Sequence, residues 1–116
     1  MPDFESLRSQ IRAFVDERDW SQFHSPKDLA VGLSVEAGEL LENFQWRDPR
    51  ADELARDPNL LQRVQEEVAD VFIYTVLLAD TLGFDLPGAV AGKLEKNRQK
   101  YPVEKTRGKA LKWNEL

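Results

Sequence analysis

The sequence predicts an all-α protein, built as one four-helix-bundle-like domain over residues 1–116. Two observations predict this class. Apolar residues recur at the three- and four-residue spacing that places them on one face of a helix, and prolines and glycines divide the chain into four such segments. At 116 residues and 41% hydrophobic content the chain closes only a modest core, which favours association with further copies.

The first predicted helix begins after Asp3, whose side chain can cap it, and runs to about Arg18. Ser25 and Pro26 open the second helix, because serine is a good N-cap and proline suits the first helical position. This second helix extends to about Gln45. The first helix looks structural, and its apolar stripe consists of Phe4, Leu7, Ile11, Phe14 and Val15.

The third predicted helix is the longest and spans Leu60 to Leu82. Breakers precede it over residues 46–59, with room for at most one short helical turn, and Gly83 ends it. Its apolar residues lie on more than one side, which is consistent with a buried interface. They include Val68, Phe72, Val76, Leu78 and Leu82.

The fourth predicted helix can be capped by Asp85 and extends to about Lys100, before Pro102 stops it. Residues 103–116 form a short, basic segment that contains glycine and has Trp113 as its only large anchor. We therefore expect these residues to form an irregular C-terminal arm.

Two pairs of acidic residues interrupt the apolar stripes of the second and third predicted helices. Glu36 and Glu39 form one pair, and Glu67 and Asp70 form the other. The i, i+3 spacing puts both members of a pair on one helix face. Because the apolar stripes pass through Glu36 and Glu67, we expect all four acids to point inward. The alternative is that they lie on solvated faces, as most carboxylates of amphipathic helices do.

Four inward carboxylates would need a cation. Two carboxylates about 4 to 5 Å apart repel each other by roughly 3 to 4 kcal/mol at an effective dielectric constant near 20. A divalent metal is the simplest remedy, and because every ligand would be an oxygen atom, Mg²⁺ or Mn²⁺ is expected ahead of zinc or copper. The predicted metal ligands are Glu36, Glu39, Glu67 and Asp70.

The composition excludes several classes of function. The absence of cysteine rules out disulfides, thiolate metal sites and thiol catalysis, and suits a reducing cytosol. A net charge of −5 argues against broad binding to a nucleic acid polymer, which needs a basic surface. No segment approaches the roughly 20 apolar residues of a membrane span, and no basic leader precedes an apolar run. We therefore expect a soluble, cytoplasmic protein.

Further segments surround the acidic pairs in a recognisable order. They are Glu17 to Pro26, the sequence Phe44-Gln-Trp46, Lys93, and Asn97 to Pro102. Together with the paired acids, they resemble the MazG-like all-α nucleoside triphosphate pyrophosphohydrolases, and within that family the dCTP pyrophosphatase branch. The resemblance covers nearly the whole chain. One departure is the short connection after Trp46, where some relatives carry a longer insertion.

The resemblance implies an enzyme that hydrolyses a deoxynucleoside triphosphate, dCTP or a modified dCTP, to the monophosphate and pyrophosphate, for sanitation of the nucleotide pool. It also implies a homotetramer built as a dimer of dimers, in which neighbouring copies help to close each site. Magnesium would bridge substrate oxygens and lower the pKa of the attacking water. One carboxylate, Glu36 or Glu39, could act as the general base, and the sequence leaves that choice open.

Polar residues on the fourth predicted helix are candidates for phosphate binding. Lys93, Asn97 and Tyr101 follow one another at i+4 spacing and so share a helix face. A lysine charge, an amide donor and a tyrosine hydroxyl suit a polyphosphate. The alternative is a solvated basic helix end, which the helix dipole favours; the resemblance makes Lys93 and Asn97 the expected ligands.

The candidates for base binding are His24, Trp46 and Tyr74. An aromatic face can stack on a pyrimidine, and a polar edge can read its exocyclic group. Most aromatic residues at helix ends simply pack in a core, and a lone histidine more often makes a structural hydrogen bond. Trp20 is expected to pack in the core.

Other functions stay open at this stage. A related enzyme acting on dUTP or on several noncanonical nucleotides would keep the same metal centre, and a non-catalytic regulatory module would bind nucleotide without turnover. A redox di-metal bundle normally needs Glu-x-x-His pairs. The only histidine, His24, lies before the second predicted helix, so the sequence does not fit that class.

Overall fold

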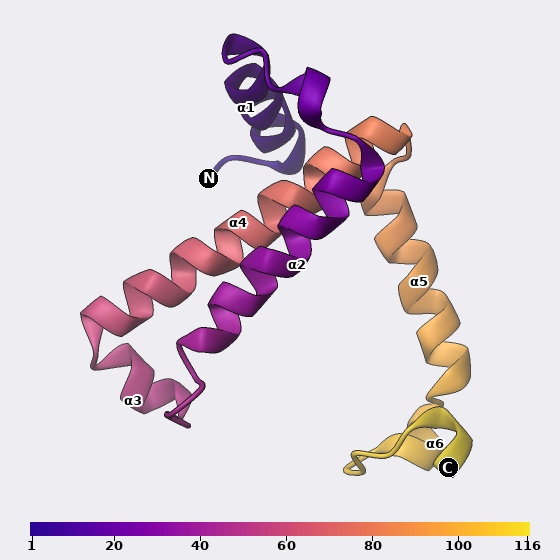
Figure 1. Cartoon of the computed structure of the whole chain (residues 1–116). Helices are drawn as coiled ribbons and strands as arrows, with labels where there is room; N and C mark the ends of the chain where they lie inside the picture. Colours follow the sequence, from indigo (N-terminus) through magenta and orange to yellow (C-terminus); the bar gives the residue numbers. More distant parts are fainter. The chain divides into compact units, whose positions relative to one another are not determined.

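The computed structural model describes all 116 residues and confirms the all-α class, with no strand. The chain divides into two compact units, Met1–Gly83 and Phe84–Leu116. Figure 1 shows the helices of both units in sequence colours. The elements are α1 (Phe4–Glu17), η1 (Ser21–Phe23), α2 (Pro26–Glu42), α3 (Ala51–Ala55), α4 (Pro58–Leu82), α5 (Leu86–Lys100), α6 (Val103–Thr106) and η2 (Trp113–Glu115).

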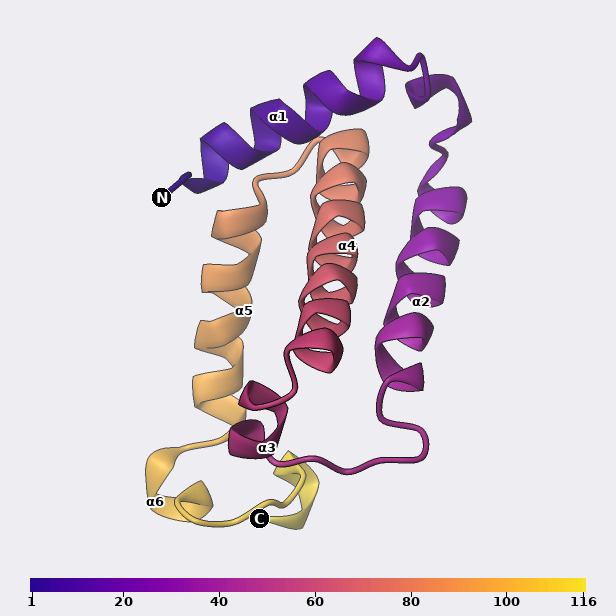
Figure 2. The same cartoon turned by 90° about the vertical axis from the view of Figure 1, so that its left-hand side faces the viewer.

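In the first unit α2 and α4 lie side by side and antiparallel, as Figures 1 and 2 show from two directions. A side-chain cap sets the start of each helix, as predicted for α2 at Ser25 but not for α4, where Asp57 was expected only as a breaker. Ser25 accepts a hydrogen bond of 3.1 Å from the backbone N–H of Asp28, and Asp57 accepts one of 3.1 Å from that of Leu60. Gly83 ends α4 in the left-handed conformation that glycine adopts without strain.

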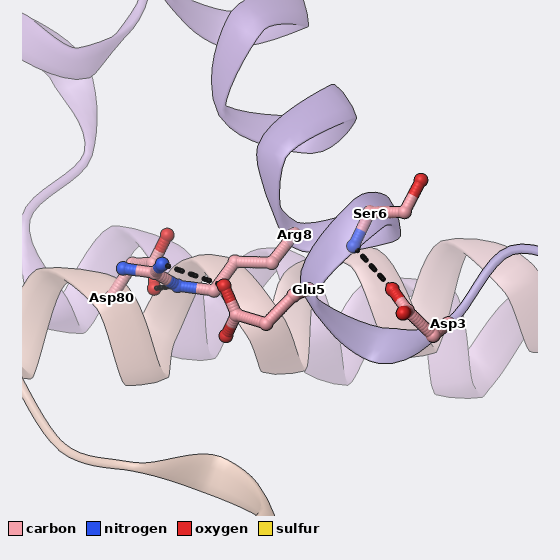
Figure 3. A network of polar contacts seen from close by, with 5 residues as sticks. All are labelled: Asp3, Glu5, Ser6, Arg8 and Asp80. Atoms are coloured by element: carbon pink, nitrogen blue, oxygen red, sulfur yellow. Dashed lines mark hydrogen bonds and ion pairs between the residues drawn. The ribbon is translucent and has the colours of Figure 1, made fainter.

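Helix α1 packs against α4 and is capped by Asp3, whose side chain accepts a hydrogen bond of 2.8 Å from the Ser6 N–H. Arg8 of α1 reaches Asp80 near the end of α4, as Figure 3 shows. Phe4 meets Phe72 edge to face, with ring centroids 6.4 Å apart. The core of the first unit is small and consists of Ile11, Val15, Leu29, Leu60, Val76, Leu77 and Ala79.

The connection between α2 and α4 holds one short helix, α3, which agrees with the single turn expected there. Helix α4 begins two residues before the predicted start, because Pro58 occupies its first turn and Asp57 caps it. Helix α2 ends at Glu42, earlier than the predicted Gln45, and the chain continues as turns.

The second unit contains α5 and the C-terminal segment. Asp85 stands at the N-cap position of α5, but its side chain makes no capping hydrogen bond. The expectation of an irregular arm over 103–116 is wrong in part, because α6 and the 3₁₀ helix η2 form there. Thr106 closes α6 by donating a 2.8 Å hydrogen bond to the Pro102 carbonyl, and the Lys100 ammonium lies 5.7 Å from the ring centre of Trp113.

Large apolar side chains stay exposed on both long helices of the first unit. Val35 on α2 and Val68 on α4 are each about half exposed, and Leu41 exposes 67% of its surface. None of the helices combines the length and the hydrophobicity of a membrane span.

Candidate functional site

Three acidic side chains from α2 and α4 meet in the first unit. Glu36, Glu67 and Asp70 each offer a carboxylate oxygen, and these three oxygens all lie within 4.8 Å of one another. All three residues are half-buried. The antiparallel packing of α2 against α4 brings them together, because each acid lies on the face that its helix turns to the other.

The electrostatics of this acidic cluster reflect both burial and mutual repulsion. The pKa of Glu36 is raised to about 7, first by the loss of solvation, then by hydrogen bonding with Glu39 and Glu67, and further by the charges of Glu39 and Asp70. Hydrogen bonding with Glu36 lowers the pKa of Glu67, but lost solvation and the neighbouring charges outweigh it, so that pKa is also raised. The cluster therefore disfavours its fully ionised form.

Glu39 departs from the sequence-based expectation. We expected all four acids to point inward, but Glu39 is exposed and lies outside the group of three mutually close oxygens. Three residues after Glu36, it has rotated toward the edge of the buried face. Its carboxyl still contacts the cluster, since hydrogen bonding with Glu39 contributes to the raised pKa of Glu36.

The acidic cluster fits a hard divalent cation. Glu36 Oε2 and Glu67 Oε2 are buried and have no hydrogen-bond partner in the protein. A buried carboxylate oxygen without a partner is costly, and a cation with oxygen ligands would satisfy both atoms at once. These acidic residues could therefore bind a metal ion.

A cavity of about 580 Å³ opens beside the acidic cluster. Its volume lies within the range usual for small-molecule sites. Glu36 and Asp70 are among its lining residues, and most of the others are apolar or aromatic. The other lining residues are Leu7, Gln10, Ile11, Phe14, Val15, Trp20, His24, Ala69, Phe72, Ile73, Tyr74 and Leu77.

Two of the three base-binding candidates, His24 and Tyr74, line this cavity together with the acids. The expectation that Trp20 packs in the core is wrong, because Trp20 is 44% exposed and also lines the cavity. Its ring meets that of Phe14 nearly at right angles, with centroids 5.7 Å apart. Two features of the sequence could have indicated that Trp20 lies at the cavity. It stands four residues before His24, and it lies outside the apolar stripe of the first predicted helix.

The expectation that the first helix has only a structural role was incomplete. Five of its residues form one wall of the cavity, so α1 both packs on α4 and shapes the site. Amphipathic spacing alone could not distinguish a residue that faces a closed core from one that faces a cavity. The α1 residues concerned are Leu7, Gln10, Ile11, Phe14 and Val15.

Trp46 is not brought to the cavity within the chain. It lies in the turns after α2, exposes 87% of its surface and does not line the cavity. A single chain therefore does not place Trp46 at the cavity, and its base-binding role stays a prediction.

The phosphate-binding candidates belong to the second unit. Lys93 and Asn97 share a face of α5, as their spacing predicts, and line a shallow apolar hollow of about 350 Å³. Tyr101 caps the end of α5 and does not line that hollow. The roles of Lys93, Asn97 and Tyr101 in binding phosphate stay predictions.

Comparisons with known proteins decide the family. The MazG-like family model matches residues 31–116, a span that includes both acidic pairs. The chain belongs to the MazG-like family. This agrees with the resemblance seen in the sequence.

Named relatives of this MazG-like chain extend over its whole length. It is 45% identical over 116 residues to dCTP pyrophosphatase 1 of Rattus norvegicus, an alignment that covers 99% of the chain and 68% of the rat protein. The Homo sapiens protein of the same name is 41% identical, with the same coverage. A crystal structure of a pyrophosphatase from Archaeoglobus fulgidus superposes with a TM-score of 0.77 at 41% identity, covering 88% of the chain and 94% of that protein.

Proposed function

We propose that this protein hydrolyses dCTP, or a modified dCTP, to the nucleoside monophosphate and pyrophosphate in a magnesium-dependent reaction. The chain is a dCTP diphosphatase-like enzyme of the nucleoside triphosphate pyrophosphohydrolase class, in keeping with relatives named dCTP pyrophosphatase 1 and a similar solved pyrophosphatase. The choice of dCTP rests on those names, and its role would be sanitation of the nucleotide pool.

One observation carries this proposal, namely that the acidic cluster opens onto a mostly apolar cavity. Glu36 and Asp70 line the same cavity as Trp20, His24 and Tyr74. A nucleotide has a charged polyphosphate at one end and, at the other, a flat base whose faces can stack on aromatic rings. The cavity offers matching surfaces, with cation-binding oxygens at one place and aromatic faces at another.

Glu36, Glu67 and Asp70 would hold the metal, with Glu39 as a further ligand from the edge of the cluster. Mg²⁺, or Mn²⁺ in its place, would neutralise charge on the polyphosphate and acidify the attacking water. The two orphaned oxygens, on Glu36 and Glu67, are the atoms best suited to contact it. Without this compensation, repulsion by the acids would keep a polyphosphate away.

The exposure of Glu39 suits it to the role of general base. A base must reach the water that attacks the α-phosphorus, and Glu39 alone among the four acids is exposed to solvent. Glu36, with one oxygen buried and unpartnered, is better suited to ligation. We therefore propose Glu39 as the general base and Glu36 as a metal ligand, a choice that the sequence left open.

The base would stack on the aromatic wall of the cavity. Trp20 and Tyr74 supply ring faces, and His24 supplies a polar edge. The phosphate chain would be contacted by Lys93, Asn97 and Tyr101, which add the positive charge and the donors that the acidic cluster lacks. Trp46 would contact the base of a site in a neighbouring copy.

We propose that the protein assembles as a homotetramer, a dimer of dimers. Its core is small, and side chains such as Val35, Leu41 and Val68 leave apolar surface exposed on α2 and α4. Association would bury that surface and contribute about 25 cal/mol for each Å². No nucleic acid polymer and no membrane is expected as a partner, and the protein would act in the cytoplasm.

Substrate profiling tests the proposed function. The protein is incubated with Mg²⁺ and each of dCTP, dUTP, dTTP and dATP, and the products are separated. Turnover of dCTP to dCMP and pyrophosphate supports the proposal, whereas preference for dUTP or for several noncanonical nucleotides would redirect it to a related enzyme. Binding of nucleotide without any turnover would indicate a regulatory module.

A further inference from the structure

Gly32 on α2 and Tyr74 on α4 approach each other too closely for any larger residue at position 32. A Cβ atom at Gly32 would lie 2.7 Å from Cζ and 3.0 Å from Cδ1 of the tyrosine ring. Ordinary carbon–carbon contacts are about 3.5 to 4.0 Å. The ring would therefore have to move by about 1 Å to accept even alanine.

Gly32 is not needed for its backbone conformation. It lies inside α2 with helical geometry, where glycine is less favourable than alanine by about 1 kcal/mol. Gly38, in the same helix, has open space around its Cβ position. The close approach to Tyr74 is thus the physical consequence of glycine at position 32.

This contact lies next to the acidic cluster. Gly32 precedes Glu36 by four residues on α2, and Tyr74 follows Asp70 by four residues on α4. Because the two helices are antiparallel, both offsets run in the same direction, and the Gly32–Tyr74 contact lies about one helical turn from the acids. Tyr74 also lines the cavity that contains Glu36 and Asp70. The space left by the missing side chain at position 32 therefore sets where one wall of the cavity stands.

We propose that the Gly32–Tyr74 contact is a specificity determinant, which sets the size of base that the cavity accepts beside the acidic cluster. The proposal rests on the proposed function, since it concerns the base of the nucleotide that is hydrolysed. Because the Tyr74 ring packs directly against α2 at Gly32, it leaves part of the cavity next to the acidic cluster unoccupied. A side chain at position 32 would displace the ring into that room and penalise the larger of two bases.

The test uses dUTP and dTTP, whose bases differ by a single methyl group, as competitive inhibitors of dCTP hydrolysis. The ratio of their inhibition constants, Ki for dTTP over Ki for dUTP, reports the space available for that group. We expect Gly32→Ala to raise this ratio about three- to tenfold, part of the 10- to 200-fold that one methyl group can be worth in a close-fitting pocket. Gly38→Ala, the matched control in α2, should leave the ratio unchanged.

Two further variants tie the effect to Tyr74. Tyr74→Leu removes the ring and should lower the ratio, and Gly32→Ala should have no further effect in the Tyr74→Leu background, because the atoms that clash are gone. Thermal melting shows whether Gly32→Ala folds. If it does not fold, the ratio of inhibition constants measured for Tyr74→Leu decides the test. A ratio unchanged by Tyr74→Leu, or by a folded Gly32→Ala, overturns the inference.

The wild-type protein separates this inference from the proposed function. Turnover of dCTP with an unvarying ratio across all variants contradicts the specificity role alone. Absence of turnover with every triphosphate contradicts the proposed function, and the inference falls with it.

Discussion

Arg8 and Asp80, 72 residues apart in the chain, form an ion pair in which Arg8 Nε donates a hydrogen bond of 2.6 Å to Asp80 Oδ1. Figure 3 shows the pair with Glu5, which lies 3.5 Å from another Arg8 nitrogen. The hydrogen bond and the charge of Asp80 raise the pKa of Arg8. Because α1 forms one wall of the cavity, this pair joins that wall to α4.

Arg8→Ala should lower the melting temperature by a few degrees and raise the KM for dCTP. The substitution leaves Asp80, whose side chain is only 13% exposed, without its partner, and weakens the attachment of α1 to α4. Arg12→Ala is the matched control, since Arg12 lies one turn further along α1 and forms no ion pair. Equal effects of the two substitutions on melting and KM would show that the pair does not hold α1.

Metal binding should stabilise the protein. At neutral pH we expect Mg²⁺ or Mn²⁺ to raise the melting temperature, and a concentration of 100 times the dissociation constant corresponds to about 2.7 kcal/mol. Glu67→Gln should abolish most of this effect while the helical circular dichroism stays. A cation-induced shift of the same size in Glu67→Gln would place the metal elsewhere.

The pH dependence of stability should carry the signature of Glu36. Its pKa is raised from an ordinary value of 4.5 to about 7, so the folded protein binds this proton more tightly than the unfolded chain does. The stabilisation from Glu36 is therefore complete below pH 4.5 and is lost as the pH rises through about 7.

The measurement is a set of melting curves between pH 5 and pH 8, with chelator present, for the wild type and Glu36→Gln. The melting temperature of the wild type relative to the variant should fall as the pH rises, because glutamine keeps a neutral group at position 36. A constant difference over this interval would mean that Glu36 titrates normally. Added Mg²⁺ should remove the decline.

Trp20 and Trp46 should act through different copies. Trp20→Ala and Trp46→Ala should each raise the KM for dCTP with a much smaller change in kcat, at a cost of about 1 to 3 kcal/mol, as base stacking typically contributes. Trp20 lines the cavity of its own chain, whereas Trp46 is exposed and does not line that cavity, so under the proposal it would reach a base only in an assembly.

Mixed assemblies test this difference between the tryptophans. When Trp46→Ala and Glu67→Gln chains are combined, sites with an intact acidic cluster and a neighbouring Trp46 should form, and part of the activity should return. If the activity of the mixture never exceeds the summed activities of the two separate variants, Trp46 does not contribute to a neighbouring site. A common factor of loss for dCTP, dTTP, dUTP and dATP would make Trp46 a packing residue.

Local features of the fold could be predicted from the sequence because they depend on near neighbours. The predicted caps at Asp3 and Ser25 act within three residues, and α1 and α2 begin where these signals place them. The cap at Asp57 was missed, so α4 begins two residues before its predicted start. The helical turns after Pro102 were missed. Their short length and basic composition give no apolar period to detect.

The acidic cluster was partly predictable. A spacing of i, i+3 indicates that two residues share a helix face, but it does not indicate how deeply each one is buried. The sequence therefore could not show that Glu36 and Glu67 are half-buried while Glu39 is exposed. The Gly32–Tyr74 contact depends on the register of α2 against α4, and Trp20 reaches the cavity through the turn at η1. Such relationships belong to tertiary packing, and no single helix encodes them.

The most direct test of the account is hydrolysis of dCTP with Mg²⁺ in water enriched in ¹⁸O. We expect dCMP and pyrophosphate in equal amounts, with the label in dCMP, because water attacks the α-phosphorus, and no product when chelator is in excess. Label in pyrophosphate or inorganic phosphate, release of dCDP, or full turnover with excess chelator would contradict the proposed reaction.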